Sequence, residues 1–340
     1  AVPAFSEGSA DPSVGALKFE EVLDRFFCLD GKCAVDGLIN FQFFGAKAGE
    51  GKSMFTVAAE QFKKLDVPVF HPPTLSGKTE EEWRRDPHPY RAELSTHFII
   101  PELQGMIESV HIACADSQRQ RKPVESRVER LCTRIRKWVD LRHKKNREKR
   151  AALFLHNAPC SGVEATLGQA TDLDGFESTV QILRALQAQG YTVREIPKTG
   201  EELQAIIRDR RAHSDFRWTA AEDIAASGGV LAAVGLEEYL PWYRSLPEDV
   251  RGRVEEVWGP PPGEAMVLEG KLLVTGVSFG NVLVMVQPKR GCYGAKCTGE
   301  VCKILQDPTC PPPHQYLATY WYLQNQWHAD AVIHLGTHGS

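Results

Sequence analysis

The last fifteen residues of the chain, 326–340, constrain its fold more than any other stretch. They read as the end of a helix, an apolar strand at residues 331–333 and the loop His334-Leu-Gly-Thr-His-Gly-Ser340. Glycines after a strand let the backbone turn sharply and approach a ligand closely. Open α/β sheets bind ligands just outside the carboxyl ends of their strands. The stretch therefore predicts a buried strand that ends in a binding loop.

Predicted helices and strands alternate along the rest of the chain, with short connections between them. This alternation is typical of parallel sheets covered by helices. We expect an α/β fold with two or more α/β lobes, each holding a mostly parallel sheet flanked by helices. The expected domains are an N-terminal lobe with a glycine-rich turn at 1–122, a long basic linking helix at 123–150, and a second lobe at 151–340.

Apolar periodicity gives more detailed expectations within this frame. Apolar residues recur at helical spacing through 124–150, which predicts one helix of that length. Residues 191–196 read as a strand, and 212–228 as a polar, irregular segment. Residues 272–277 and 282–286 read as two paired strands around a short turn.

Composition narrows the class of protein. Apolar residues make up 42% of the 340 residues and charged residues 25%, as in ordinary globular domains. A net charge of -4 gives no reason to expect nucleic acid as a partner, and no apolar run is long enough for a membrane span. Nine cysteines spread over a chain of this size fit reduced thiols better than a disulfide framework. We therefore expect a cytoplasmic protein.

A glycine-rich segment, Gly45-Ala-Lys-Ala-Gly-Glu-Gly-Lys-Ser53, lies between a predicted strand and a predicted helix. A nucleotide-binding P-loop requires four residues between its first glycine and Gly-Lys-Ser. That glycine would have to be residue 46, which is Ala46. The register favours an ordinary glycine-rich turn, although an anion at the helix N-terminus is the alternative.

The predicted helix at 124–150 is strongly basic. Eleven Lys or Arg residues fall between Arg127 and Arg150, against three Asp or Glu residues. Such a face is usually a solvated helix surface, and the alternative is a surface for an acidic partner.

Histidines gather at the predicted strand ends. His334 and His338 lie four residues apart in the terminal loop, His156 ends the predicted strand 151–156, and His314 begins a predicted helix. A neutral imidazole ligates divalent metals and carries protons near neutral pH, so His334 and His338 are our catalytic and metal-ligating candidates. The alternative for each histidine is a packed residue that bonds to backbone. Substrate-binding candidates are Gln287, His314, Gly336 and Gly339.

The loop before the last helix carries further groups that could hold a metal. Four thiols within nineteen residues could bind zinc or an iron–sulfur cluster, although the spacing matches neither a zinc ribbon nor a ferredoxin, and reduced loop cysteines are the alternative. Glu300, Asp307 and Gln287 are acid–base candidates near the same face, and solvent-facing loop residues are the alternative for each. The thiols are Cys292, Cys297, Cys302 and Cys310, and a weaker pair is Cys28 and Cys33.

Several motifs together resemble the large subunits of cobaltochelatase and magnesium chelatase. The resemblance extends over nearly the whole chain, because weaker matches lie at Glu81-Glu-Trp83, Pro101-Glu-Leu103 and Arg127-Val-Glu-Arg-Leu-Cys132, and its last sixty residues are the most specific part. Its motifs are Trp258-Gly-Pro-Pro-Pro-Gly263, Gly280-Asn-Val-Leu-Val-Met-Val-Gln-Pro288, Pro311-Pro-Pro-His-Gln315, Tyr316-Leu-Ala-Thr-Tyr320 and Ala329-Asp-Ala-Val-Ile-His-Leu-Gly-Thr-His-Gly-Ser340.

The resemblance implies a subunit that binds a corrinoid or porphyrin macrocycle and inserts a divalent metal as substrate. It also implies that separate AAA+ partner subunits hydrolyse ATP. In the family, a Leu-Glu pair follows the Gly-Thr-His-Gly-Ser motif, and its carboxylate is a catalytic candidate. We therefore expect this chain to be an internal piece of a longer protein, inactive on its own.

The branch of the family is suggested by the loop after Gln287. The magnesium branch usually has a Gly-Tyr-Glu-Gly-Asp-Pro type of loop there, whereas this chain has the cysteine-rich segment 291–310. This difference favours cobalt and a corrinoid precursor, with magnesium and protoporphyrin as the alternative, or a metal-binding scaffold without catalysis.

Overall fold

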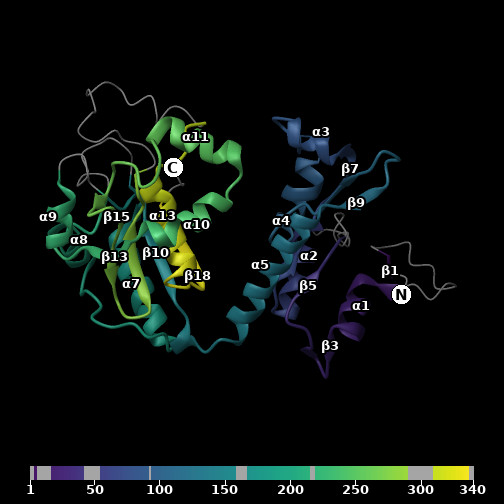
Figure 1. Ribbon diagram of the computed structural model, residues 1–340. Helices are drawn as coiled ribbons and strands as arrows, with labels where there is room; N and C mark the ends of the chain where they lie inside the picture. Colours follow the sequence, from purple (N-terminus) through teal and green to yellow (C-terminus); the bar gives the residue numbers. More distant parts are fainter. Residues whose placement is uncertain are drawn as a thin grey trace. The chain divides into compact units, whose positions relative to one another are not determined.

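The computed structural model describes residues 4–5, 17–41, 54–91, 93–157, 167–214, 219–289 and 309–336. They form two compact units, unit 1 at Ala1–His143 and unit 2 at Lys144–Ser340 (Figure 1). Both units combine helices with β-strands, and the longest sheet is mostly parallel. The expected α/β class, with mostly parallel sheets flanked by helices, is confirmed.

A four-stranded sheet organises unit 2, with strand order β16-β17-β10-β18. The last three strands run parallel, and β16 pairs with β17 in the antiparallel direction. All residues of β10 and β17 are buried, which explains why their sequences are continuous apolar runs rather than alternating ones. The bounds are Val277–Ser278 for β16, Val282–Val286 for β17, Ala151–Leu155 for β10 and Ala331–Leu335 for β18.

Helices cover both faces of this sheet (Figure 1). Successive side chains of a strand point to opposite faces, so Leu153 packs in one core and Phe154 in the other. The Leu153 side contains residues of α7 (Gly175–Ala188) and α8 (Gly200–Asp209). The Phe154 side contains residues of α10 (Leu236–Ser245), α11 (Glu248–Trp258) and α13 (His314–Asn325).

Side-chain caps fix where α7 and α8 begin. The Asp174 carboxylate accepts a hydrogen bond from the Glu177 amide at 2.9 Å, and the Thr199 hydroxyl accepts one from the Glu202 amide at 3.2 Å. Such caps satisfy amides that have no partner within the helix, and each stabilises a helix by about 1 kcal/mol.

Unit 2 also contains an antiparallel sheet of β13 (Val230–Val234), β15 (Lys271–Thr275) and β14 (Val267–Leu268), in the order β13-β15-β14. The remaining elements are the short strands β11 (Gln169–Ala170) and β12 (Leu173–Asp174), and the helix α9 (Ala221–Ala226).

Unit 1 is built from short strands and six helical segments in its described part. Parallel strands β5 and β6 pack against α2 and the segment around Met106, through a core of Phe62, Val69 and Met106. A second sheet has the order β7-β8-β9.

The helices are α1 (Phe19–Phe26), α2 (Met54–Leu65), α3 (Glu80–Arg85), the π-helical turn Leu94–Ile99, α4 (Ile100–Leu103) and α5 (Glu125–His143). The strands are β1 (Ala4–Phe5), β2 (Leu17–Lys18), β3 (Cys28–Leu29), β4 (Lys32–Cys33), β5 (Leu38–Ile39), β6 (Val69–Phe70), β7 (Thr74–Thr79), β8 (Ala113–Ala115) and β9 (Arg121–Pro123).

The final strand differs from its prediction in burial. It was expected to be buried, but β18 has only β10 as a described neighbour, and Val332 and Ile333 are 42% and 39% exposed. The prediction was wrong because an apolar sequence does not reveal whether a strand lies at the centre or the edge of its sheet.

The long basic helix is shorter than predicted. It ends at His143 instead of continuing to residue 150, because Lys145 adopts an extended backbone (φ -66°, ψ 139°) before a single 3-10 turn at Asn146–Glu148. The helix lies within unit 1. Several of its cations have partners within unit 1: Arg134 pairs with Glu108, Arg136 forms an exposed pair with Asp140, and Arg127 donates to the carbonyl of His111.

Three other local predictions were wrong. The expected strand at 191–196 forms only one bridge, between Val193 and Gly280. The segment 212–228, expected to be irregular, contains α9. The strand at 272–277 does not pair with 282–286 as one hairpin, because the chain changes sheet at Gly276 and only β16 pairs with β17.

Candidate functional site

The carboxyl edge of the parallel sheet in unit 2 brings three sequence segments together. The amide of His156 donates to the carbonyl of Leu335 at 3.0 Å, and the amide of Gln287 donates to the carbonyl of Leu155 at 2.9 Å. The ends of β17, β10 and β18 are therefore in register. This places Gln287, His156 and Gly336 side by side at the edge where parallel sheets bind ligands.

His334 lies within β18, opposite Phe154 in β10. The two rings stack with centroids 5.0 Å apart and planes 10° apart. On α13, the Tyr320 ring is 6.1 Å from the imidazole at 15°, and its hydroxyl oxygen is 3.5 Å from His334 Nε2. His334 is exposed as a residue, but the partial burial of its ring lowers the pKa of His334, so the imidazole is neutral at neutral pH. A neutral ring keeps one nitrogen lone pair for a proton or a metal ion.

A series of side-chain contacts, through Tyr320 and Tyr316, connects His334 to Gln287. The Gln287 amide nitrogen donates to the Tyr316 hydroxyl at 3.3 Å, and the rings of Tyr316 and Tyr320 lie 5.1 Å apart. Gln287 itself is only 4% exposed. Burial raises the pKa of Tyr320, so its hydroxyl keeps its proton and can donate. We define the strand-end cluster as Phe154, Gln287, Tyr316, Tyr320 and His334.

Sequence reasoning missed the aromatic members of the strand-end cluster. Tyr316 and Tyr320 are four residues apart on α13, a spacing that places them on one face of the helix. That spacing was available as a signal, but the register that brings Phe154 opposite His334 was not.

His314 occupies a different position from the strand-end cluster. It is 2% exposed, with Nε2 2.9 Å from the carbonyl oxygen of Gly259 and Nδ1 3.4 Å from the Tyr239 hydroxyl. The Tyr243 ring is 5.1 Å away at 66°. Burial lowers the pKa of His314. In this structure His314 is a packed, neutral core residue, and its expected contact with substrate stays a prediction.

Several predicted residues lie outside the described residues: His338 and Gly339, Glu300 and Asp307, the cysteines 292, 297 and 302, and the glycine-rich turn 45–53. Of the four-cysteine cluster, the structure describes Cys310, which is buried. Within the described ranges, no group of three or more His, Cys, Asp or Glu side chains is placed to hold a metal ion. Metal binding at His338 and at the cysteines stays a prediction.

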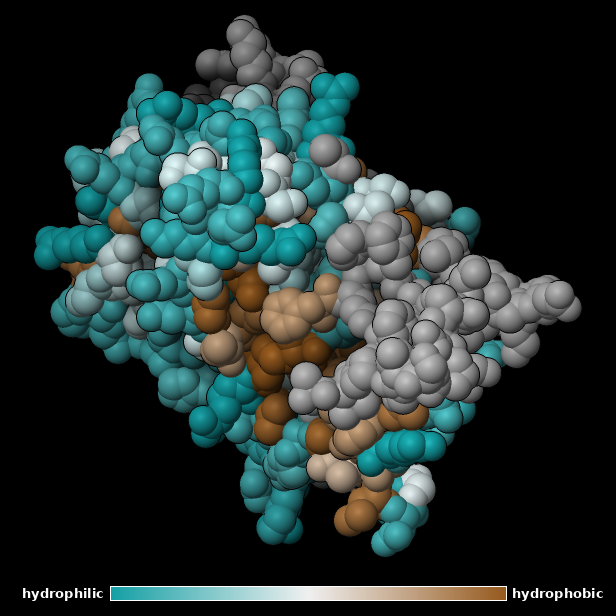
Figure 2. Space-filling model, turned by 90° about the vertical axis from the view of Figure 1, so that its right-hand side faces the viewer, coloured by the Kyte–Doolittle hydropathy of each residue, from teal (hydrophilic) through white to brown (hydrophobic). Residues whose placement is uncertain are grey.

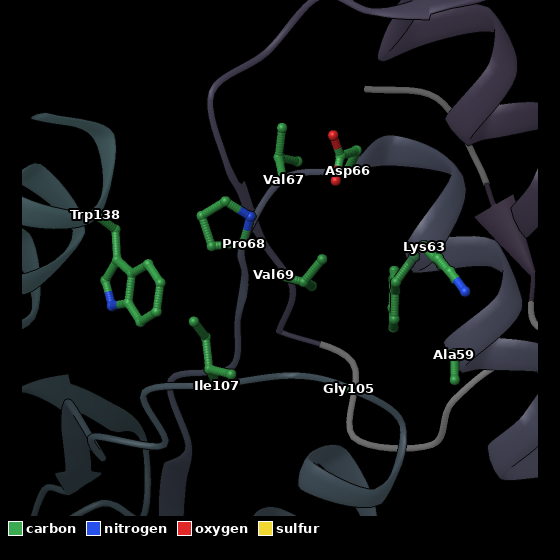
Figure 3. A pocket seen from close by; sticks show the side chains of 10 residues that line it. Ala59, Lys63, Asp66, Val67, Pro68, Val69, Gly105, Ile107 and Trp138 are labelled. Atoms are coloured by element: carbon green, nitrogen blue, oxygen red, sulfur yellow. The ribbon is translucent and has the colours of Figure 1, made fainter. Parts of the chain in front are cut away.

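Unit 1 contains an open pocket of about 440 Å³ between α2, the segment before β6, and α5 (Figure 3). The indole of Trp138 faces Pro68 and Ile107 across it, and the ammonium of Lys63 and the carboxylate of Asp66 lie at its margin. Seen from the right-hand side of Figure 1, the surface is mostly hydrophilic, and apolar residues gather in one region of it (Figure 2). The pocket contains no residue that the sequence predicts as functional.

Comparison with known proteins assigns the family. The family model described as CobN/Magnesium Chelatase matches residues 1–340, which is the whole chain. This chain belongs to the CobN/magnesium chelatase family. Its predicted resemblance is therefore confirmed.

Relatives from both branches of the family share this stretch of sequence. The chain is 39% identical to an uncharacterised protein of Methanocaldococcus jannaschii, covering 100% of this chain and 28% of that protein. It is 30% identical to the chloroplastic magnesium-chelatase subunit ChlH of Oryza sativa subsp. indica, over 96% of this chain and 22% of that protein. It is 33% identical to the aerobic cobaltochelatase subunit CobN of Pseudomonas aeruginosa, over 73% of this chain and 20% of that protein. This chain thus spans about a quarter of the length of these relatives.

A solved structure has the same fold as this chain. The catalytic subunit of cobaltochelatase from Mycobacterium tuberculosis superposes with a TM-score of 0.72 at 24% sequence identity, over 97% of this chain and 26% of that one. Among the described residues, no helix combines the length and apolar character needed to cross a membrane.

Proposed function

We propose that this chain forms part of the large, tetrapyrrole-binding subunit of an ATP-dependent metal chelatase that inserts cobalt into a corrinoid precursor. The observation that carries the proposal is the parallel stack of Phe154, His334 and Tyr320 at the carboxyl edge of the sheet. Family membership over all 340 residues supports the same class of protein. In this proposal, AAA+ partner subunits hydrolyse the ATP.

The chemistry of metal insertion explains why a neutral imidazole is useful. A divalent metal enters the ring as protons leave the ring nitrogens, so the site needs a proton acceptor and a place for the ion. The lone pair of neutral His334 can serve either role. The Tyr320 hydroxyl, which keeps its proton, supplies a hydrogen-bond donor beside it, and the Tyr316 hydroxyl accepts from Gln287. His338 remains our second candidate for these roles.

Flat aromatic surfaces suit a flat ligand. Aromatic rings prefer offset-stacked contacts, worth about 0.5–1.5 kcal/mol beyond the apolar area that they bury. Among the described strands β18 pairs only with β10, and His334 is exposed, so we propose that an incoming macrocycle packs against its imidazole. Gln287 and Gly336 border the same edge as substrate-binding candidates, and Gly339 follows in the sequence.

The choice between metals depends on the segment after Gln287. The cysteine-rich sequence 291–310 replaces the loop expected of the magnesium branch and favours cobalt. Magnesium and protoporphyrin are the alternative, since relatives named for each metal match this chain at similar identity.

The proposal is tested by titrating this chain with a metal-free corrinoid and, in parallel, with protoporphyrin, followed by the absorbance of each macrocycle. We expect saturable binding with a lower Kd for the corrinoid. Tighter binding of protoporphyrin would favour the magnesium alternative. Binding of neither macrocycle would contradict the proposal.

A further inference from the structure

The hairpin of β3 and β4 in unit 1 places two cysteines opposite each other. Strand β3, labelled in Figure 1, is Cys28–Leu29; β4 is Lys32–Cys33, and Asp30 and Gly31 join the two strands. Both turn residues have positive φ, 51° and 73°. Positive φ at both central positions is the requirement of a type I′ turn, for which Asp-Gly is a preferred sequence. The turn thus fixes the register of the hairpin.

The register makes Cys28 and Cys33 a directly facing pair. Cys28 pairs with Cys33 and Leu29 with Lys32, and one step further the Ala34 amide donates to the carbonyl of Phe27 at 2.8 Å. Hydrogen-bonded and non-hydrogen-bonded pairs alternate along an antiparallel ladder, so the cysteines form the non-hydrogen-bonded pair. Facing Cα atoms of such a pair are about 4.5 Å apart, within the range of about 4.4–6.8 Å that a disulfide spans.

Both thiols are free and accessible. Cys28 and Cys33 are partly exposed, and the neighbouring Leu29 is 69% exposed, so the hairpin lies at the surface. The other described cysteines lack this combination, because Cys114 and Cys310 are buried and Cys132, although exposed, lies alone on α5.

We propose that Cys28 and Cys33 are a redox-sensitive pair that forms a reversible disulfide by exchange with a low-molecular-weight disulfide. One thiolate attacks a sulfur of the small disulfide, forming a mixed disulfide and releasing one small thiol. The second cysteine then attacks the protein sulfur of the mixed disulfide and releases the other small thiol. In total, two protein thiols and one small disulfide give one protein disulfide and two small thiols.

The position of the pair makes the disulfide a reversible modification. It closes a loop of only six residues, 28–33, and a loop this short constrains the unfolded chain little. Exposed disulfides of this kind are the labile ones. The oxidised hairpin would join the end of α1 covalently to the segment that leads into β5.

The test is to equilibrate the chain with graded ratios of oxidised and reduced glutathione, alkylate the remaining thiols and map tryptic peptides by mass. Trypsin cleaves after Arg25, Lys32 and Lys47, so the disulfide would join peptides 26–32 and 33–47. We expect this linked species, about 2 Da lighter than the sum of its two reduced peptides, to appear with oxidised glutathione and to disappear on reduction. Cys132→Ser should leave the linked species unchanged, whereas Cys28→Ser should abolish it.

Mapping of the unsubstituted chain decides the outcome even if a variant fails to fold. Glutathione attached separately to Cys28 or Cys33 without the linked species would overturn the proposal. The proposal would also be overturned if the thiols of Cys28 and Cys33 stayed unmodified in a sample in which Cys132 has been oxidised. The test involves neither macrocycle nor metal, so its outcome is independent of the proposed function.

Discussion

Phe154 and His334 are register partners on adjacent parallel strands, and their rings stack 5.0 Å apart at 10°. Phe154 is fully buried, whereas His334 is exposed on β18, which pairs with β10 alone among the described strands. The buried ring therefore fixes the plane of the exposed one. A macrocycle that packs on the open side of the imidazole would meet a surface that is already oriented.

The Lys144–Asp330 ion pair should stabilise unit 2. Both carboxylate oxygens of Asp330 accept from Lys144 Nζ, at 2.9 and 2.7 Å, and one also accepts from the Arg150 amide at 2.7 Å. These bonds hold the starts of β10 and β18 together. We expect Asp330→Ala to lower the free energy of unfolding by about 1–3 kcal/mol, measured by urea titration. The control Asp209→Ala, which removes an exposed pair with Arg208, should change it by less than about 0.5 kcal/mol. Equal losses in both variants would contradict this account.

Replacement of Gly263 and of Gly252 by alanine should change the stability of the chain in opposite directions. Gly263 has φ +70°, and a Cβ there would lie 3.1 Å from Cδ2 of His314. Gly263→Ala should cost about 1–3 kcal/mol of stability, because an L-residue is strained in this conformation and His314 must shift. Gly252 lies within α11, and a Cβ added there would meet no atom within 4 Å. Gly252→Ala should instead stabilise the chain by about 0.4–1 kcal/mol. Thermal and urea unfolding measure both, and a neutral Gly263→Ala would contradict the described packing of His314.

His111 should make unit 1 less stable in acid. Burial, followed by the nearby Arg127, lowers the pKa of His111 to about 4, from 6.5 in the unfolded chain. Below pH 6.5 the unfolded state binds a proton that the folded state excludes, so stability falls as the pH drops from 6.5 towards 4. Between pH 7.5 and 5, the unsubstituted chain should lose about 2 kcal/mol more than His111→Phe. The same loss in both proteins would show that His111 is not the group responsible.

The elements of unit 2 were predictable where one local signal dominates. The run Ala-Ala-Leu-Phe-Leu at 151–155 is apolar throughout, as a strand buried on both faces must be, and β10 has those bounds. The run at 331–333 carries the same signal, yet β18 is largely exposed and has one neighbour among the described strands, because burial depends on which neighbours a strand acquires. Tyr191 and Val193 alternate as in a strand, but the chain there forms a single bridge.

The strand-end cluster was predictable only in part. His334 and Gln287 stood out because each follows or ends an apolar run near a glycine or proline. Tyr320 and Phe154 become partners of His334 through sheet register and helix packing, which no local pattern contains. His314 shows the opposite case. Its place at a helix start suggested a site, but its environment, with Tyr239, Tyr243 and Gly259, is core.

We propose that the macrocycle binds the face of β18 that carries His334. His334→Gln and Ile333→Gln are a matched pair, since both residues are exposed on β18 and point to opposite faces of the sheet. The decisive measurement is the Kd of each variant for a metal-free corrinoid, from absorbance titration. We predict that His334→Gln raises the Kd about tenfold, equivalent to about 1.4 kcal/mol, and that Ile333→Gln leaves it within about twofold. An unchanged Kd for His334→Gln, or an equal rise in both variants, would contradict the claim.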